Sequence, residues 1–336
     1  SNFKGYGSKK QAPLSGCDEQ GFSFPRNDHP LGDADSDLPL QPETLCGNAL
    51  PGFGRMNKGH TFVVTGGTGG IGLEVARQLA NTGACVVIVG RSEERTQRAQ
   101  DDLINSTSNP EIHPFLADLS SMEEVAALAT NIQRQFPSIQ GLINNAALIT
   151  AKRKLTDEGM ERMFAVNYLA PFLLTQRLTP ALRNGAPSHL INVASNAHRW
   201  AKTVDFANLQ AEQKFDFRIA YGTQKLCNIL HTFEFSRRHA SAGITANAHH
   251  PGEVATNLGN NGPWYMRAYW KLAAHSRLSP EEGARPISED ILTPQTTGTY
   301  FERGIKVTPS DLAQDQGVAK QLWDYTEEIL KPFRQA

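Results

Sequence analysis

The sequence has few cysteines, no excess of charge of either sign and no long apolar run. Lys and Arg number 33 against 34 Asp and Glu, a formal net charge of -1, so no basic field favours a nucleic acid as partner. No stretch reaches the roughly 20 apolar residues of a transmembrane helix, and the N-terminus lacks an apolar signal core. These absences predict a cytoplasmic protein that acts on a small molecule; its natural start stays open.

The scattered cysteines and histidines predict neither a disulfide framework nor a metal site. Cys85 and Cys227 lie in apolar runs, which predicts buried thiols in a reducing compartment. Whether Cys17 and Cys46 pair stays open, since both lie in a loop-like segment. The three histidines that suggest a metal lack the i, i+4 spacing of a helical ligand pair and are expected in the core or in loops. They are His198, His249 and His250.

Composition divides the chain into an irregular Pro- and Gly-rich extension over residues 1–58 and one domain over residues 59–336. In the domain, short apolar strands alternate with amphipathic helices. Strands are expected at 61–65, 85–89, 112–116, 140–144, 188–194 and 244–249. Helices are expected at 71–80, 92–105, 121–136, 156–183 and 218–240. This alternation predicts an α/β fold, a single doubly wound (Rossmann) domain with a parallel sheet, helices on both faces and a ligand crevice at the carboxyl ends of the strands.

A glycine-rich turn stands between the first predicted strand and the first predicted helix. In the run T-G-G-T-G-G-I-G, Gly66, Gly70 and Gly72 have the spacing G-x-x-x-G-x-G. Glycine permits a tight turn and lets backbone amides approach a pyrophosphate, whose charge the helix N-terminus stabilises. The turn therefore predicts a dinucleotide cofactor.

The end of the second predicted strand favours NADP(H) over NAD. It reads Gly90-Arg91-Ser92, without the terminal carboxylate that binds the ribose hydroxyls of NAD. Arg91 can instead make charge-assisted bonds to a 2′-phosphate, with help from the Ser92 hydroxyl. An alternative stays open in which Arg91 faces solvent and Glu93 or Glu94 binds the ribose.

Tyr221 and Lys225 stand one turn apart on the predicted helix over 218–240, which Ile219 and Leu226 support as apolar positions. A nearby ammonium stabilises a phenolate, so we expect Lys225 to lower the pKa of Tyr221 toward working pH. The pair predicts a proton donor and acceptor at one substrate atom. The spacing Y-x-x-x-K is common, so it carries weight only with the other motifs.

Together these motifs resemble the short-chain dehydrogenase/reductase superfamily over residues 59–330. A-D-L-S, N-N-A-A, V-N-Y-L-A-P-F, I-N-V-A-S and H-P-G-E-V-A-T follow in the family's order. The sequence is most similar to the retinol dehydrogenase and WW-domain oxidoreductase branch, in L-T-D-E-G-M-E-R-M-F-A-V-N, in K-L-C-N-I-L and in a long segment between Ser195 and Tyr221. It departs from the family at Ala147, where glycine is usual, and in the absence of a membrane-anchoring helix before the domain.

The resemblance implies hydride transfer between a nicotinamide and a carbonyl or alcohol carbon. It implies that Tyr221 passes the proton, that Lys225 also binds the ribose, that Ser195 bonds the substrate oxygen and that Asn167 positions a water. It also implies that Asp118 contacts the adenine and that the segment after Pro251 contacts the carboxamide. The implied cofactor contacts are Gly66, Thr68, Gly69, Gly70, Ile71, Gly72, Arg91, Ser92, Asp118, Leu119, Asn145, Ala146, Ala147, Tyr221, Lys225, Pro251, Gly252, Val254 and Thr256.

The family places a substrate lid near residues 257–290, and here that segment is rich in aromatic side chains. This favours a bulky, lipophilic or aromatic substrate. The predicted substrate contacts are His198, Trp264, Tyr265 and Tyr269. An alternative stays open in which the aromatic side chains pack on the core, on a second copy in a homodimer, or on a membrane surface as a peripheral contact.

Other functions stay open on the same fold. One is a catalytically inactive, cofactor-binding regulator or scaffold that uses the extension for interactions. Another is an epimerase or dehydratase. A protochlorophyllide-reductase-like enzyme is disfavoured, because Glu253 stands where those enzymes carry a cysteine.

Overall fold

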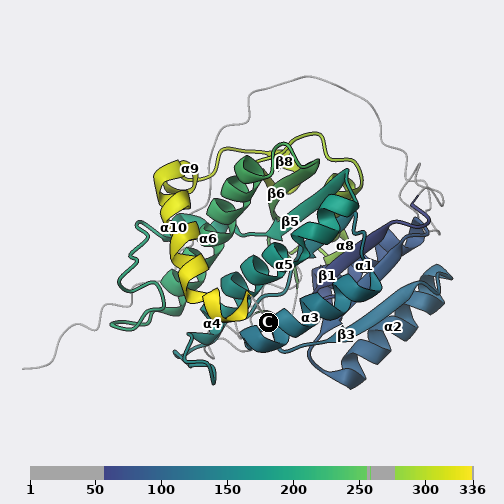
Figure 1. The fold of residues 1–336 in the computed structure, drawn as a ribbon, viewed down its shortest axis with the longest axis horizontal. Helices are drawn as coiled ribbons and strands as arrows, with labels where there is room; N and C mark the ends of the chain where they lie inside the picture. The colour runs from purple at the N-terminus through teal and green to yellow at the C-terminus, as the bar shows by residue number, and fades with distance from the viewer. Residues whose placement is uncertain (1–56, 256–257, 259–276, 335–336) are drawn as a thin grey trace, which may run out of the picture. The chain divides into compact units, whose positions relative to one another are not determined.

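One sheet of eight strands organises the computed structural model, which describes residues 57–255, 258 and 277–334 (Figure 1). The strand order is β3-β2-β1-β4-β5-β6-β7-β8, and only the pairing of β7 with β8 is antiparallel among the described strands. The strands are β1 Thr61–Thr65, β2 Cys85–Gly90, β3 Ile112–Leu116, β4 Gly141–Asn144, β5 Ser188–Val193, β6 Ile244–His250, β7 Thr299–Glu302 and β8 Ile305–Lys306. The strand order reverses between β1 and β4, where such folds bind ligands.

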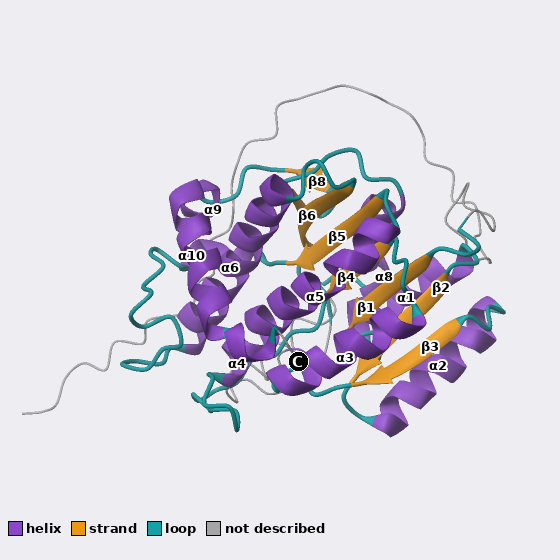
Figure 2. Cartoon of the chain, viewed as in Figure 1, coloured by secondary structure: helices purple, strands orange, loops and turns teal. Residues whose placement is uncertain are grey.

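Helices cover both faces of this sheet (Figure 2). The α-helices are α1 Gly70–Asn81, α2 Glu93–Thr107, α3 Met122–Gln135, α4 Arg162–Phe164, α5 Ala170–Asn184, α6 Phe217–Arg238, α8 Pro280–Leu292, α9 Asp311–Gln314 and α10 Gln316–Ile329. The other helical segments are the π-helix η1 Ala165–Leu169 and the 3₁₀ helices η2 Asn196–Trp200 and η5 Lys331–Phe333. The structure confirms the predicted fold class.

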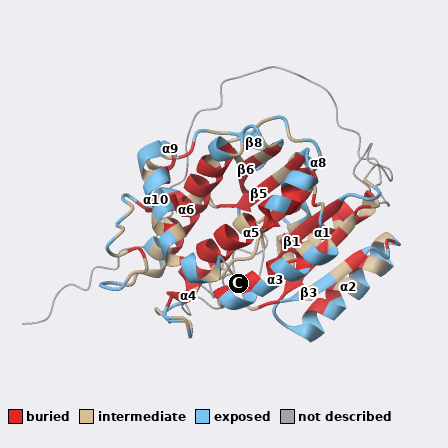
Figure 3. Ribbon diagram, in the orientation of Figure 1, coloured by how far each residue is buried: buried red, intermediate tan, exposed pale blue. Residues whose placement is uncertain are grey.

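The apolar runs of the strands follow from this two-sided cover. In β1, Phe62 and Val64 pack with α1, α2 and α8, whereas Val63 packs with α3, α5 and α6 on the opposite face. All five residues of β1 are buried, so no position alternates to solvent. Figure 3 shows the buried strands against the exposed outer faces of α2 and α3.

The single helix predicted over 156–183 is wrong in its first part. Leu155 forms an isolated bridge with Glu161, and regular helix begins only at Arg162. Glu161 is the N-cap of α4, and its side chain accepts from the N–H groups of Met163 and Phe164, so the helix begins directly after it. Pro171 has no N–H to offer the carbonyl of Asn167 four residues earlier, and the π-helical turn η1 lies at this point.

The C-terminal part of the predicted lid is a helix that packs on the core. Residues 280–290 belong to α8, which opens with a capping box between Ser279 and Glu282. Its buried residues Ala284, Ile287 and Ile291 belong to the apolar cluster on the α1 side of the sheet. The predicted contacts Thr256, Trp264, Tyr265 and Tyr269 lie outside the described residues.

The predictions for the extension also fall outside the described part of the chain, including the pairing of Cys17 with Cys46. Cys85 is half-buried and Cys227 is buried, and both are free thiols. Within the described residues, no helix is long and apolar enough to cross a membrane.

Candidate active site

The glycine turn after β1 presents the open N-terminus of α1. Gly66 and Gly70 have φ of 67° and 56°, a left-handed conformation that favours glycine. Gly69 precedes α1 without a side-chain cap, and the first turn of the helix carries no acidic residue. Among the described residues other than its chain neighbours, the Arg95 guanidinium alone comes within 4 Å of where a Cβ on Gly69 would stand, at 3.9 Å. The turn therefore offers uncapped N–H groups and room above them, which fits a pyrophosphate.

The chain after β4 is hydrogen-bonded to this turn. Thr65 Oγ1 accepts from the N–H groups of Asn145 (3.0 Å) and Ala146 (3.1 Å), and Asn145 Nδ2 donates to Thr65 O at 2.9 Å. A Cβ at Gly72 would stand 2.4 Å from both Asn145 Nδ2 and the Gly66 carbonyl oxygen. Asn145 and Gly72 thus hold the turn at the β1–β4 switch point. Ala146 and Ala147 are half-buried at the same edge.

The residues after β2 and β3 form the neighbouring wall of the crevice. Gly90 packs against Thr68 of the turn, where an added Cβ would stand 2.5 Å from Thr68 Cγ2. The Arg91 side chain is 63% exposed, and its Nη1 lies 3.8 Å from Asp118 Oδ2. Burial acts to raise the pKa of Asp118, but hydrogen bonds from Ser120 and nearby arginine charges hold it below its usual value. Asp118 is thus a carboxylate beside Arg91 at neutral pH.

Ser92 and Arg95 lie near this wall, at the start of α2. Ser92 is the N-cap of α2, and its Oγ accepts from the N–H of Arg95 at 3.4 Å. Arg95 lines a cavity of about 280 Å³ beside the glycine turn, together with Thr68 and Arg98. The sequence analysis missed Arg95, although its position one turn after Arg91 at a helix start is a usable signal.

Tyr221 on α6 lies against the turn that follows β5. Ser195 is the N-cap of η2, where its Oγ accepts from the N–H of Ala197 at 3.2 Å, and it also hydrogen-bonds Tyr221. The next residue, Gly222, makes the close approach possible, because a Cβ there would stand 2.6 Å from the Ala197 carbonyl oxygen. Tyr221 is buried, whereas Ile219, counted as an apolar helix position, is 50% exposed.

Lys225 is buried beneath this pair. Its Nζ donates to the carbonyl oxygen of Val193 at 2.6 Å and lies 5.7 Å from the centre of the Tyr221 ring. Burial lowers the pKa of Lys225 to about 8. Burial also raises the pKa of Tyr221, opposed by the hydrogen bond with Ser195. In this structure burial and the Ser195 hydrogen bond act on the pKa of Tyr221, and the lowering expected from Lys225 is not observed.

Asn167 lies in the π-helix and binds the chain opposite. Its Oδ1 accepts from the N–H of Leu148 at 2.7 Å, while Nδ2 donates to Leu148 O and to Gln224 Oε1, each at 2.8 Å. Both N–H donors and one lone pair of the side-chain amide are thus engaged within the protein, which leaves the backbone carbonyl of Asn167 as a further acceptor for a water. That carbonyl lacks its α-helical partner because of Pro171.

His198 is not a substrate contact in this structure. It is fully buried, its Nδ1 lies 2.8 Å from the carbonyl oxygen of Ser195, and its Nε2 accepts from the N–H of Ser310 at 3.1 Å. Burial lowers its pKa to about 4. Both ring nitrogens therefore bind protein groups, and the neutral ring joins the Ser195 turn to the chain before α9.

The segment after β6 is fixed to the chain before α8. Gly252 has a φ of 93°, and Val254 forms a bridge with Leu278. The bridge bonds run from Leu278 N to Glu253 O and from Ala255 N to Leu278 O, both 3.0 Å. Along an extended chain the backbone groups alternate in direction, so the N–H and C=O of Val254 point away from this bridge.

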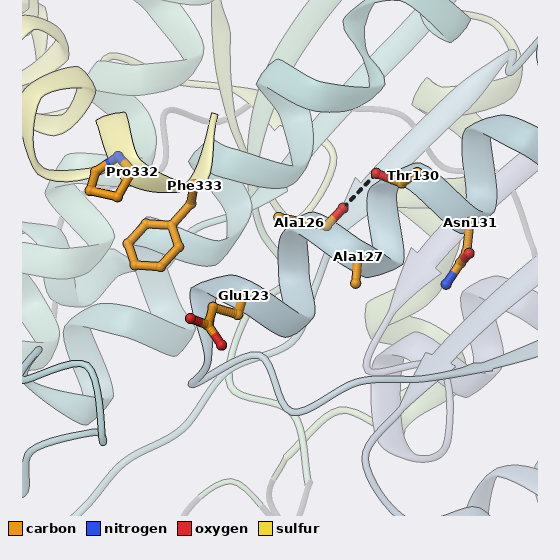
Figure 4. Close-up of a pocket in the computed structure, with 7 residues that line it drawn as sticks. All are labelled: Glu123, Ala126, Ala127, Thr130, Asn131, Pro332 and Phe333. Carbon is orange, nitrogen blue, oxygen red and sulfur yellow. Dashed lines mark hydrogen bonds between the residues drawn. The ribbon is translucent and has the colours of Figure 1, made fainter. Parts of the chain in front are cut away.

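Two other features lie apart from these residues. A surface cavity of about 540 Å³ lies between α3 and the C-terminal turn, with Ala126, Ala127 and Phe333 among its lining residues (Figure 4). No predicted site residue lines it. Cys85, Glu111 and His113 bring potential metal ligands within 4.8 Å of one another at the amino ends of β2 and β3, a grouping that the sequence analysis did not identify. Burial raises the pKa of the Cys85 thiol to about 11.

Comparisons with known proteins agree with this geometry. Residues 60–263 match the family model for short chain dehydrogenases. Retinol dehydrogenase 13 of Mus musculus is 33% identical over 87% of this chain and 89% of its own length. The WW domain-containing oxidoreductase of Danio rerio is 30% identical over 88% of this chain and 75% of its own. An uncharacterized protein of Mycobacterium paratuberculosis, 26% identical, superposes with a TM-score of 0.68 over 82% of this chain and 94% of its own.

Proposed function

Because the chain belongs to the short-chain dehydrogenase family, we propose that it is an NADP(H)-dependent oxidoreductase acting on the carbonyl or alcohol group of a bulky, lipophilic substrate. The observation that carries this proposal is the meeting of the buried Tyr221 and Lys225 with the half-buried Ser195 at the carboxyl edge of the sheet, the same edge at which α1 presents its open N-terminus. The nicotinamide dinucleotide supplies hydride when bound. The rest of the chemistry is proton handling by these side chains.

Tyr221 is the proposed proton donor to the substrate oxygen. Its raised pKa keeps the phenol protonated at neutral pH, which is the form that carbonyl reduction requires. Ser195, hydrogen-bonded to Tyr221, would donate to the same oxygen as negative charge develops there. Lys225 would hold ribose hydroxyls and pass a proton to Tyr221 from a water at the Asn167 carbonyl, which would restore the phenol.

The residues of the glycine turn fit the dinucleotide. Backbone N–H groups at Gly69, Gly70 and Ile71 would bind the pyrophosphate, and Asp118 and Leu119 would contact the adenine. Further contacts would come from the backbone of Asn145, Ala146 and Ala147. Gly252 and Val254 would contact the carboxamide, which the outward direction of the Val254 backbone supports.

NADP(H) is proposed over NAD because the residue that follows β2 is an arginine instead of a carboxylate, and a second arginine lies beside the glycine turn. Arg91 and Arg95 flank the glycine turn, with Asp118 as the nearest carboxylate to Arg91. Guanidinium groups bind phosphate through charge-assisted bonds. Ser92 caps α2 and could add a bond to the same phosphate.

The substrate proposal is supported by the relatives and by the predicted aromatic segment. The name of the mouse relative specifies retinol, a long apolar alcohol. The test is NADPH oxidation with a panel of lipophilic aldehydes, steroids, quinones and small ketones, and the reverse reaction on their alcohols. Turnover that rises with apolar bulk supports the proposal, and indifference to size contradicts the substrate class.

The same panel separates the competing functions. Cofactor binding without turnover of any compound would favour a regulator or scaffold. Product formation without net change in the cofactor would favour an epimerase or dehydratase. The proposal requires that cofactor oxidation and product appear in equal amounts.

A further inference from the structure

A chain of buried hydrogen bonds runs from the backbone of Leu148 through Asn167 and Gln224 to Glu161. Asn167 bonds both backbone groups of Leu148, at 2.7 and 2.8 Å, and donates to Gln224 Oε1 at 2.8 Å. Gln224 Nε2 in turn donates to Glu161 Oε2 at 3.3 Å. Glu161, Asn167 and Gln224 are 1%, 1% and 2% exposed, so water does not compete for these bonds.

The two ends of this series of hydrogen bonds require the same orientation of the Asn167 and Gln224 side-chain amides. The N–H of Leu148 can only donate, so it takes the oxygen of the Asn167 amide and leaves the NH₂ group for Gln224. An ionised carboxylate can only accept, so Glu161 takes the NH₂ group of Gln224 and leaves its oxygen for Asn167. One orientation of each amide therefore satisfies every group, and an amide flip at either position would break bonds.

Glu161 is held firmly enough to set that direction. Its carboxylate accepts from the N–H groups of Met163 at 3.0 Å and Phe164 at 2.7 Å, at the start of α4. Burial raises the pKa of Glu161, whereas these N–H groups favour the carboxylate form. The bond to Gln224 goes beyond helix capping, because it reaches across to α6.

We propose that Glu161 and Gln224 are positioning residues, which lock the turn of α6 that carries Lys225 onto Asn167 and Leu148. Gln224 directly precedes Lys225 in the sequence, and Leu148 follows the chain that leaves β4 along the crevice. Small errors in the placement of reacting groups lower rates strongly. The catalytic part of the proposal rests on the proposed function; the hydrogen-bonded arrangement does not.

A charge introduced at position 224 tests the arrangement. Gln224→Glu brings a second carboxylate against Glu161, so we expect kcat to fall about thirtyfold while the KM for NADPH changes about twofold or less. In the double variant Glu161→Gln with Gln224→Glu, the amide NH₂ group at position 161 can donate to the carboxylate at position 224. The amide oxygen at position 161 can still accept from the first N–H groups of α4. Its kcat should return to within about fivefold of wild type.

Hydrogen exchange supplies a readout that needs no turnover. Peptides containing the Leu148 amide should exchange faster in Gln224→Glu than in wild type and recover in the double variant. Gln78→Glu is the matched control, since Gln78 is a buried glutamine on α1 whose Nε2 donates to the Glu281 carbonyl oxygen. This control should lose stability without changing exchange at Leu148.

The outcomes distinguish the two proposals. A wild-type protein with no turnover of any substrate defeats the proposed function, and exchange at Leu148 still decides the arrangement. An active wild type whose kcat and Leu148 exchange are unchanged in Gln224→Glu overturns the positioning roles. A double variant no better than Gln224→Glu also overturns them, because it means that the two side chains are not coupled.

Discussion

Lys225 extends from α6 to the last residue of β5, where its Nζ donates to the carbonyl oxygen of Val193 at 2.6 Å. This bond buries an ammonium group below a buried phenol, and burial lowers the pKa of Lys225 from 10.5 to about 8. The folded chain therefore disfavours the charged form that the unfolded chain keeps. A buried cation that weakens the fold is typical of residues retained for function.

Replacing Lys225 by methionine should remove the destabilisation that the buried ammonium group causes. Between pH 8 and 10 the unfolded chain binds more protons at this site than the folded chain, so the wild-type contribution to stability rises with pH. The Tm of Lys225→Met relative to wild type is therefore expected to be highest near pH 7 and to decline toward pH 10. Turnover should fall at least about 100-fold at every pH. A Tm difference that does not change with pH contradicts the burial of a titrating lysine.

Two glycines of the cofactor turn should respond differently to the same change. Gly72→Ala forces a Cβ to within 2.4 Å of the Gly66 carbonyl oxygen, which can move only if the turn moves, so we expect a lower Tm and weaker cofactor binding. At Gly69 the nearest atom lies 3.9 Å away and φ is 173°, which any residue adopts. Gly69→Ala should therefore keep the wild-type Tm and lose only NADPH affinity, measured by fluorescence titration. Equal Tm losses would contradict the turn geometry.

The sequence was sufficient for the fold class and for placing the motifs at the ends of the strands, because these follow from short-range rules. The predicted bounds of β1 match the structure, because a strand that is buried on both faces has a continuous apolar sequence; those of β3 match as well, although this edge strand is only partly buried. The glycine turn could be predicted for a similar reason, because the spacing of its glycines between a strand and a helix is a local sequence feature. Family membership, which the comparisons confirm, rested on the order of such motifs.

What the sequence did not predict depends on tertiary contacts. Burial raises the pKa of Tyr221, and the i, i+4 spacing between Tyr221 and Lys225 gives no information about that burial. His198 was predicted as a substrate contact, yet its ring nitrogens bond groups at Ser195 and Ser310, which lie more than 100 residues apart in the sequence. The bond from Gln224 to Glu161 likewise joins residues that only the folded chain brings together.

Arginine at the end of β2 should decide the choice of cofactor. Arg91→Ala removes a cation that the proposal assigns to the 2′-phosphate, so the Kd for NADPH should rise about tenfold or more. NADH, which lacks that phosphate, serves as the internal control and should bind with nearly unchanged affinity. Arg95→Ala should act in the same direction if its guanidinium beside Gly69 reaches the phosphate. A preference for NAD that survives both substitutions would falsify the assignment.

Acid should destabilise the protein through its buried histidines. His231 packs against Phe172 and Trp323 in the core, and burial lowers its pKa from 6.5 to about 3. The unfolded chain takes up this proton as pH falls below 6.5, so stability present above pH 6.5 is lost between about pH 6.5 and 3. His231→Phe should remove roughly 2 kcal/mol of the stability loss between pH 7 and 5, measured by urea unfolding. An unchanged pH dependence would mean that His231 is protonated in the fold.

The removal of one hydroxyl tests the central claim most directly. In Tyr221→Phe the ring still fills its place against Ile149 and Met163, but the proposed proton donor is gone. With NADPH and a lipophilic ketone or aldehyde that the wild type reduces, we expect turnover to fall at least about 1,000-fold while the Kd for NADPH stays within about threefold of wild type. Turnover close to that of the wild type in this variant would contradict the account, because the proton would then come from another group.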